Sequence, residues 1–341
     1  MLKRMLEERK LPPLRSREEM LELLQKEVYG YLPPKPEKLS FETVGAIAPH
    51  FCAGKARGDK VIAHCTIAGK EFSFPFNSVV PADGKKHPFF VHINFRPDVP
   101  DRYMPTEELV DNGYAVLSFD YNDVARDNDD FTDGLAGVLF ENGKRKPADP
   151  GKIAMWAWAA HRVMDYAQTL TEELEVDKGI VCGHSRLGKT ALFAAATDER
   201  FAIGYSNNSG CTGAALSRGK EGESVGRICF RFPYWFCENY QKHGEKEQEM
   251  PFDQHYLLAS IAPRPVLVGS ASEDAWADPI SEQLSCLAAA PAFGGDFQCD
   301  RPAQVGDAFL EGKVGYHLRK GLHYFSRTDW LRLMEFAAKH L

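Results

Sequence analysis

The sequence predicts an α/β fold in which helices flank a mostly parallel central sheet. Two observations carry this prediction. Short apolar runs alternate with helical segments along most of the chain, and a serine stands at a sharp turn between one such run and the next helix. Strands that alternate with helices form right-handed β-α-β units, whose strands pair in parallel. The 341 residues suffice for one large domain or two smaller ones.

The composition excludes several classes of protein. With 44% hydrophobic and 26% charged residues, the chain lies in the ordinary range of globular proteins. Its 41 basic and 48 acidic residues give a net charge of −7 without a basic cluster, which argues against a nucleic-acid partner. No apolar run approaches the roughly 20 residues that cross a bilayer, so we expect no membrane partner.

The charged N-terminus is followed by Pro12 and Pro13, where a secretory signal would have an apolar stretch. We therefore expect a cytoplasmic protein, or a secreted one if a signal has been removed. The eight cysteines form no C-x-x-C pair and no zinc-like spacing, so reduced thiols are expected.

The first 80 residues predict a helix and an antiparallel region. Ser16 and Glu19 have the spacing of a capping box and predict a helix that runs to about Tyr29, before a proline-rich stretch. The residues from 39 to 80 are typical of short strands. Within them, Ala68-Gly69 predicts a hairpin turn between strands at 61–66 and 71–76.

From residue 87 onward the chain alternates between strands and helices. The expected strands are 87–95, 114–120, 179–182 and 263–269, and the expected helices are 105–112, 153–170, 187–197 and 328–341. Residues 210–252 depart from this rhythm, since they mix glycine, charge and aromatic residues without a clear period. Such an insertion between strands commonly covers the carboxyl ends of a sheet. We therefore predict a single domain over residues 1–341, with the insertion as a pocket wall.

Candidate chemistry begins at residues 183–189, Gly-His-Ser-Arg-Leu-Gly-Lys, between an expected strand and helix. A serine on such a turn projects its hydroxyl above the sheet, and the helix N-terminus directs free N–H groups toward an oxyanion formed there. This is the nucleophile elbow of α/β-hydrolases, although Leu187 stands where the strict G-x-S-x-G pattern has glycine. A serine that only caps the N-terminus of a helix after a strand would give a similar sequence pattern.

The order of the remaining candidates favours a hydrolase. Proteins of this fold place an acid after a later strand and a histidine near the end of the chain. Here Asp274 follows the apolar strand at 263–269, and His323 lies just before the final helix. His323 would take the proton of Ser185, and Asp274 would orient the imidazole. Glu273 is the alternative acid, because neighbouring side chains at a strand end point in different directions.

Residues 183–189 resemble the elbow of the glucuronoyl esterases, carbohydrate esterase family 15, which reads G-x-S-R-x-G-K. The resemblance extends from about residue 29 to the C-terminus, through YGYLPP, SGCTGAALSRG, MPFDQH, APRP and SEDAWADP. It implies an α/β-hydrolase fold and cleavage of the ester between 4-O-methyl-glucuronic acid of xylan and an alcohol of lignin, without metal or cofactor. The residues it implies are Ser185, His323 and Asp274 for the triad, Arg186 for the oxyanion, and Lys189, Glu223 and Trp276 for substrate binding.

Two positions depart from the family pattern. Some members carry the acid at the position of Asn208, which cannot act as a carboxylate, so the later acid must serve here. Fungal members often have cysteine where this chain has His184, so a disulfide between the elbow and the histidine loop is absent.

The expected partner is therefore a glucuronate ester of xylan or of a xylo-oligosaccharide. The alternatives are an acetyl xylan esterase or another carbohydrate esterase with the same triad, a peptidase, and an inactive binding protein of the same fold. The sequence does not indicate the oligomeric state or the alcohol part of the ester.

Overall fold

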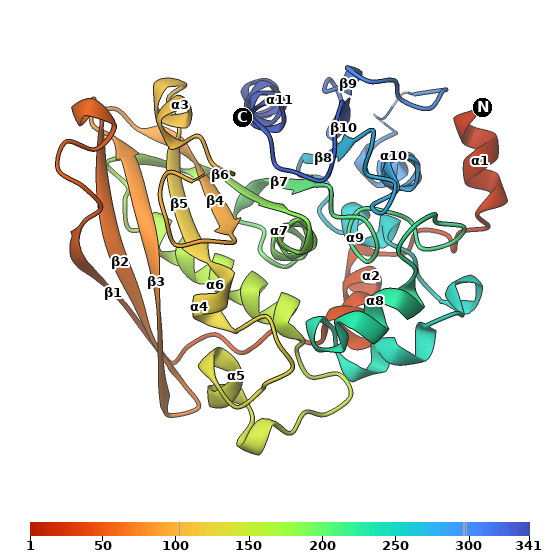
Figure 1. Cartoon of the computed structure of the whole chain (residues 1–341), viewed down its shortest axis with the longest axis horizontal. Helices are drawn as coiled ribbons and strands as arrows, with labels where there is room; N and C mark the ends of the chain where they lie inside the picture. The colour runs from red at the N-terminus through yellow and green to blue at the C-terminus, as the bar shows by residue number, and fades with distance from the viewer. Residues whose placement is uncertain (102, 296, 298) are drawn as a thin grey trace.

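A ten-stranded sheet forms the centre of the computed structural model, which describes residues 1–101, 103–295, 297 and 299–341 (Figure 1). The strands lie in the order β1-β2-β3-β5-β4-β6-β7-β8-β10-β9. Their bounds are β1 Lys38–Ala46, β2 Ala56–Ile67, β3 Lys70–Pro81, β4 His87–Asn94, β5 Ala115–Asp120, β6 Leu174–His184, β7 Phe201–Asn207, β8 Val266–Ala271, β9 Ala308–Phe309 and β10 Val314–Arg319.

The sheet has an antiparallel part and a longer parallel part. Strands β1, β2, β3 and β5 pair in antiparallel fashion, and the pairs from β5 through β4, β6, β7 and β8 to β10 are parallel. The predicted hairpin is present, because Ile67 pairs with Lys70 around Ala68 and Gly69, both at positive φ. The predicted α/β-hydrolase fold with a mostly parallel sheet is thus confirmed.

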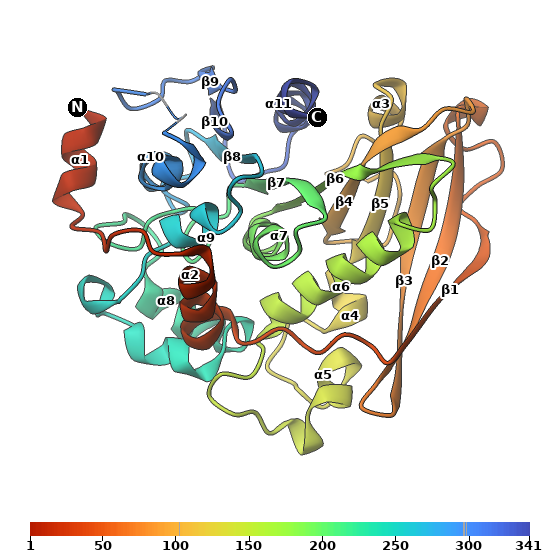
Figure 2. The same ribbon diagram turned by 180° about the vertical axis from the view of Figure 1, so that it is seen from behind.

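Helices cover both faces of the sheet (Figures 1 and 2). Their bounds are α1 Leu2–Glu8, α2 Arg17–Leu24, α3 Thr106–Asp111, α4 Tyr121–Val124, α5 Gly134–Leu139, α6 Lys152–Ala167, α7 Arg186–Thr197, α8 Val225–Arg231, α9 His255–Ala259, α10 Pro279–Ala289 and α11 Arg327–His340. Helices α3 and α11 lie on one face, and α6 and α7 lie on the other. In the part of the chain described, no helix combines the length and apolar character needed to cross a bilayer.

Two apolar clusters fill the space between the helices and the sheet. Successive residues of β6 alternate between them: Ile180 and Cys182 pack with α3 and α11, and Val181 packs with α6 and α7. This alternation follows from the period of a strand, whose side chains point to opposite faces. Burial on both faces explains why the parallel strands are apolar runs without a polar side.

Some elements differ from the sequence predictions. The capping box at Ser16 and Glu19 begins a helix as predicted, but α2 ends at Leu24 and a π-helical turn follows, over Gln25–Tyr29. Strands β7, β9 and β10 have no counterpart among the predicted strands. In β10, His317 and Arg319 are buried and have polar partners, so this segment lacks the apolar pattern that predicts strands β4, β5, β6 and β8.

The carboxyl ends of the parallel strands place the candidate residues along one edge of the sheet. Ser185 follows β6, Asn208 follows β7, and Asp274 and His323 follow β8 and β10. The segment between β7 and β8, which includes α8, lies at the same edge, and seven of its residues line the pocket described below.

Candidate active site

Ser185 occupies a strained turn between β6 and α7. Its φ of 58° and ψ of −125° lie outside the regions that non-glycine residues normally adopt. A side chain at Gly183 would place its Cβ 2.3 Å from the carbonyl oxygen of Leu187, so this turn requires glycine there. The Ser185 N–H donates to the carbonyl of Asn207 at 2.8 Å, which ties the turn to β7. These features define a nucleophile elbow.

Leu187, the misfit to G-x-S-x-G, is fully buried in the core. The close approach that the last glycine of that pattern allows occurs one residue later, at Gly188. A Cβ on Gly188 would lie 3.0 Å from Ser206 Oγ and 3.1 Å from Ser209 Cβ. The spacing G-x-S-x-x-G therefore still lets helix α7 pack closely on β7.

His323 is paired with Asp274. The distance from His323 Nδ1 to Asp274 Oδ2 is 2.6 Å, and Asn208 Nδ2 donates to the same oxygen at 2.9 Å. Burial alone would raise the pKa of Asp274, but the hydrogen bonds from His323 and Asn208 hold it below the usual value. The side chain of Glu273 is exposed to solvent, so the structure brings Asp274 and not its neighbour to the imidazole.

Ser185 and His323 line the same pocket, whose volume is about 330 Å³. Among the hydrogen bonds of the described residues, none joins Ser185 Oγ directly to the His323 ring. Catalytic hydrogen bonds are commonly loose in a ligand-free site and tighten when substrate binds. One pocket is thus lined by Ser185, His323 and Asp274.

Arg186 begins helix α7 beside the serine, and its guanidinium reaches the pocket. Its Nη1 donates to Asp127 Oδ2 and, at 3.3 Å, to the hydroxyl of Tyr121. The guanidinium carbon lies 4.8 Å from the centroid of the Trp235 ring, close enough for a cation–π contact. A fixed positive charge therefore stands at the N-terminus of the helix, next to Ser185.

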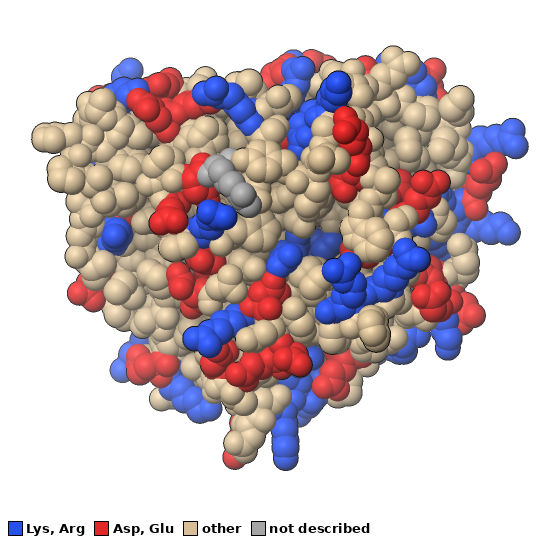
Figure 3. Space-filling model, viewed as in Figure 1, with Lys and Arg blue, Asp and Glu red and all other residues tan. Residues whose placement is uncertain are grey.

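Three further predicted residues, Lys189, Glu223 and Trp276, line the same pocket. Lys189 is buried, its Nζ donates to the backbone carbonyls of Ser209 and Cys211, and burial lowers its pKa. Glu223 is also buried, whereas the Trp276 ring is 44% exposed. On the face drawn in Figure 3, acidic and basic side chains are interspersed. The described residues include no group of three His, Cys, Asp or Glu side chains placed to hold a metal ion.

Arg319, which forms an ion pair with Asp329, stabilises the loop that carries His323. Arg319 donates to the carbonyls of Lys320 and Leu322, each at 3.1 Å, and to that of Tyr324. Its Nε also bonds the buried Asp329 at 2.7 Å. The eight cysteines, all of which the structure describes, are unpaired. The loop is therefore held by charged hydrogen bonds.

His184 packs behind the candidate triad, with its ring centroid 4.5 Å from that of His323. Its Nδ1 lies 2.6 Å from Asn207 Oδ1, an acceptor, so the proton of the neutral ring is on Nδ1. Burial, and next the nearby His323, lower the pKa of His184 to about 3. His184 is therefore a neutral packing partner of His323.

Several residues of the site were not predicted from the sequence. Asp127 and Tyr121 contact the Arg186 guanidinium, and Asn208 donates to the acid. Nothing in their sequence surroundings marks Asp127 and Tyr121, because they reach the site only through folding, whereas Asn208 was noted only as a position where some family members carry the acid. The pocket wall also includes Arg231, Phe232 and Trp235, which belong to the insertion at 210–252 and were predicted only as part of it.

The sheet, the elbow and the Asp274–His323 pair define an α/β-hydrolase. A family model described as "Glucuronyl esterase, fungi" matches residues 63–294. The chain belongs to this family, the glucuronoyl esterases of carbohydrate esterase family 15.

Similar proteins agree with the family assignment. Carbohydrate esterase MZ0003, from an unknown prokaryotic organism, is 40% identical over 69% of this chain and 55% of its own length. The 4-O-methyl-glucuronoyl methylesterase 1 of Wolfiporia cocos is 30% identical over 53% of this chain and 46% of its own length. The chain thus spans about half the length of these curated relatives.

Solved structures are similar over nearly the whole chain. A glucuronoyl esterase from Solibacter usitatus superposes with a TM-score of 0.87 at 30% identity, covering 96% of this chain and 92% of that one. A promiscuous CE15 esterase from a marine bacterial metagenome gives 0.85 at 31% identity, covering 95% and 91%.

Proposed function

We propose that the protein is a serine esterase that hydrolyses the ester between an alcohol and glucuronic acid, or its 4-O-methyl ether, on xylan or xylo-oligosaccharides. Alcohols of lignin are the proposed leaving groups. The observation that carries the proposal is the pocket in which Ser185, the Asp274–His323 pair and Arg186 meet beside polar and aromatic side chains. Membership of the glucuronoyl esterase family supports the choice of a uronate ester.

In the first step, Ser185 Oγ attacks the ester carbonyl carbon while His323 Nε2 takes the hydroxyl proton. Asp274 accepts from His323 Nδ1, which keeps Nε2 free to act as the base and stabilises the imidazolium that forms. The pKa of Asp274 is held below its usual value, so this carboxylate is charged at neutral pH.

The tetrahedral intermediate carries a negative oxygen next to the helix N-terminus. The Arg186 guanidinium and the free N–H groups of the first turn of α7 supply positive charge there. Such a donor is fixed before the reaction begins, and removing one typically costs about 10²–10³ in kcat.

Collapse of this intermediate breaks the bond to the alcohol, which leaves with the proton held by His323. Water then attacks the acyl-enzyme, again giving its proton to His323, and the uronic acid is released as Ser185 regains its hydrogen. The balance of atoms needs only water, and no metal or cofactor takes part in it.

The pocket walls suit a sugar ring better than an acetyl group. Lys189 uses two donor positions on the Ser209 and Cys211 carbonyls, which leaves a third for a ligand hydroxyl. The Glu223 carboxylate can accept from another hydroxyl, and the exposed Trp276 ring offers a flat surface for a sugar face. A volume of about 330 Å³ exceeds what an acetyl group requires.

The proposal is tested by comparing turnover of benzyl glucuronate with that of an acetylated xylo-oligosaccharide. We expect a preference for the glucuronate ester, loss of turnover in Ser185→Ala without loss of fold, and a lower kcat in Arg186→Ala. A strong preference for the acetyl ester would instead favour an acetyl xylan esterase. An unchanged kcat in Arg186→Ala would contradict the oxyanion role.

A further inference from the structure

Asp127 contacts the guanidinium of Arg186 but does not line the pocket. It lies in the loop after α4, and 14% of its side chain is exposed. Its Oδ2 accepts from Arg186 Nη1 and, at 3.0 Å, from the hydroxyl of Tyr121. Its Oδ1 accepts from Trp235 Nε1 at 2.6 Å. One carboxylate therefore joins the arginine to two aromatic donors.

The position of Asp127 is fixed independently of Arg186. Its backbone N–H donates to Asn122 Oδ1 at 3.1 Å, and the Tyr234 hydroxyl donates to its carbonyl at 3.3 Å. Burial, and next the Asp127 charge, raise the pKa of Tyr121 to about 12, so this hydroxyl stays a donor at neutral pH. The carboxylate thus presents a defined oxygen to the guanidinium.

Besides Asp127, the guanidinium has one polar neighbour among the described residues, the Tyr121 hydroxyl, which accepts from the same Nη1 at 3.3 Å and is itself bound to Asp127. The remaining described neighbours of the guanidinium are aromatic rings. Its carbon lies 4.8 Å from the Trp235 centroid, 5.6 Å from that of Phe95 and 5.9 Å from that of Phe232. Ring faces attract a cation through their quadrupole, but they do not select the direction in which its N–H groups point. Oxyanion stabilisation depends on that direction, because donors must aim at the place where charge develops.

We propose that Asp127 is a positioning residue, which orients the Arg186 guanidinium toward the oxyanion by binding one of its ends. The inference rests on the proposed function of the site, since orientation matters only if Arg186 stabilises that oxygen. Asp127 also reduces the net positive charge at the site. If charge mattered more than direction, removal of Asp127 would accelerate the reaction, so the sign of the effect separates the two possibilities.

A double-mutant cycle tests whether Asp127 acts through Arg186. In the wild-type background, Asp127→Asn should lower kcat by about 10- to 100-fold, the size expected for a misplaced catalytic group, with KM within about twofold. In the Arg186→Ala background, the same change should leave kcat within about twofold. The inference would be overturned if the losses of kcat in the two single variants multiplied in the double variant, or if kcat rose in Asp127→Asn.

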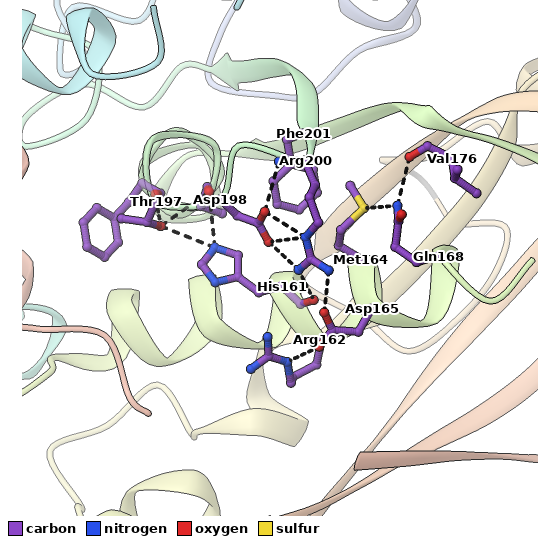
Figure 4. A network of polar contacts seen from close by, with 12 residues as sticks. His161, Arg162, Met164, Asp165, Gln168, Val176, Thr197, Asp198, Arg200 and Phe201 are labelled. Carbon is purple, nitrogen blue, oxygen red and sulfur yellow. Dashed lines mark hydrogen bonds and ion pairs between the residues drawn. The ribbon is translucent and has the colours of Figure 1, made fainter. Parts of the chain in front are cut away.

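Asp165 provides a matched control. It accepts from Arg162 Nε and Arg200 Nη1, each at 2.6 Å, in the polar network shown in Figure 4. This network lies at the C-terminal end of α7, where Thr197 is, whereas Ser185 stands at the other end. Asp165→Asn should therefore lower stability without changing kcat. If it lowered kcat as much as Asp127→Asn does, loss of an ion pair would explain both and the inference would fail.

The rate at which a fluorophosphonate labels Ser185 gives a second readout that needs no sugar. Labelling passes through an oxyanion at phosphorus, so the same cycle applies to its rate, followed by intact mass. If the wild type is labelled but does not hydrolyse benzyl glucuronate, the proposed substrate is wrong, and the cycle on labelling still decides the role of Asp127. A wild type that is not labelled would overturn both proposals.

Discussion

The variant Asp274→Asn exchanges one carboxylate oxygen for an amide nitrogen of nearly the same size. Asp274 Oδ2 accepts from His323 at 2.6 Å and from Asn208 at 2.9 Å, and Oδ1 accepts from the backbone N–H of Ala277 at 3.3 Å. An amide nitrogen in either position would face a donor. Each rotamer of the new side chain therefore loses at least one hydrogen bond, and the negative charge disappears in both.

The loss of the negative charge sets the smallest decrease in kcat that we expect. Unit charges about 4 Å apart attract by about 4 kcal/mol at an effective dielectric constant of about 20. Removing this attraction from the imidazolium costs about 10³-fold in kcat, at 1.36 kcal/mol per factor of ten. In the rotamer that turns the amide nitrogen toward His323, the imidazole adopts the wrong tautomer. The loss of kcat then approaches about 10⁴-fold, as for the equivalent change in a serine protease.

The assay is kcat on benzyl glucuronate at saturation, with Glu273→Gln as the control. Glu273 is the adjacent exposed carboxylate, and its variant should stay within about twofold of the wild type. Adding Asn208→Asp to Asp274→Asn should restore part of the activity, because residue 208 reaches within 2.9 Å of the Asp274 carboxylate. The assignment of Asp274 as the acid would be refuted if Asp274→Asn kept more than about one tenth of the wild-type kcat, or if Glu273→Gln lost as much kcat as Asp274→Asn does.

Three other changes test the support of the site. Arg319→Met leaves the Asp329 charge buried without its partner, so the free energy of unfolding in urea should fall by about 3–5 kcal/mol, and a loss below about 1 would contradict the ion pair. Gly183→Ala brings a Cβ 2.3 Å from the Leu187 carbonyl, and urea melts should show a loss above about 3 kcal/mol. Burial raises the pKa of Glu282 from 4.5 to about 7. The folded state keeps this proton after the unfolded chain has lost it, so wild-type stability should decline relative to Glu282→Gln as pH rises from 4.5 to 7, by about 3 kcal/mol in all. Parallel stability curves would contradict that pKa.

Local patterns in the sequence predicted those parts of the fold that local physics determines. The capping box at Ser16 and the turn at Ala68-Gly69 depend on residues within a few positions of one another, and both are present. Ser185 could be found because it follows a predicted strand, and His323 because it stands just before the final helix, where the chain order of a known fold places the histidine. The choice between Asp274 and Glu273 needed the direction of two side chains, which composition does not contain.

Other parts of the site depend on contacts between distant segments. Asp127 lies in a run of polar residues, and nothing local distinguishes it from Asp129 or Asp130; its position opposite Arg186 arises from tertiary packing. The same reason hides β10, where His317 and Arg319 are buried with partners elsewhere in the chain. Buried polar residues of this kind are satisfied only in the folded state, so a pattern of hydrophobicity does not reveal them.

Strands β7 and β8 are neighbours in the sheet, and the residues that follow them meet beside His323. Asp274 contacts the imidazole directly, and Asn208 contacts the Asp274 carboxylate. In a descendant with aspartate at position 208, either carboxylate would be close enough to orient the histidine. Asp274 could then be replaced without passing through an inactive enzyme. The neighbouring strands thus give this lineage a stepwise evolutionary route by which the catalytic acid can move along the sheet.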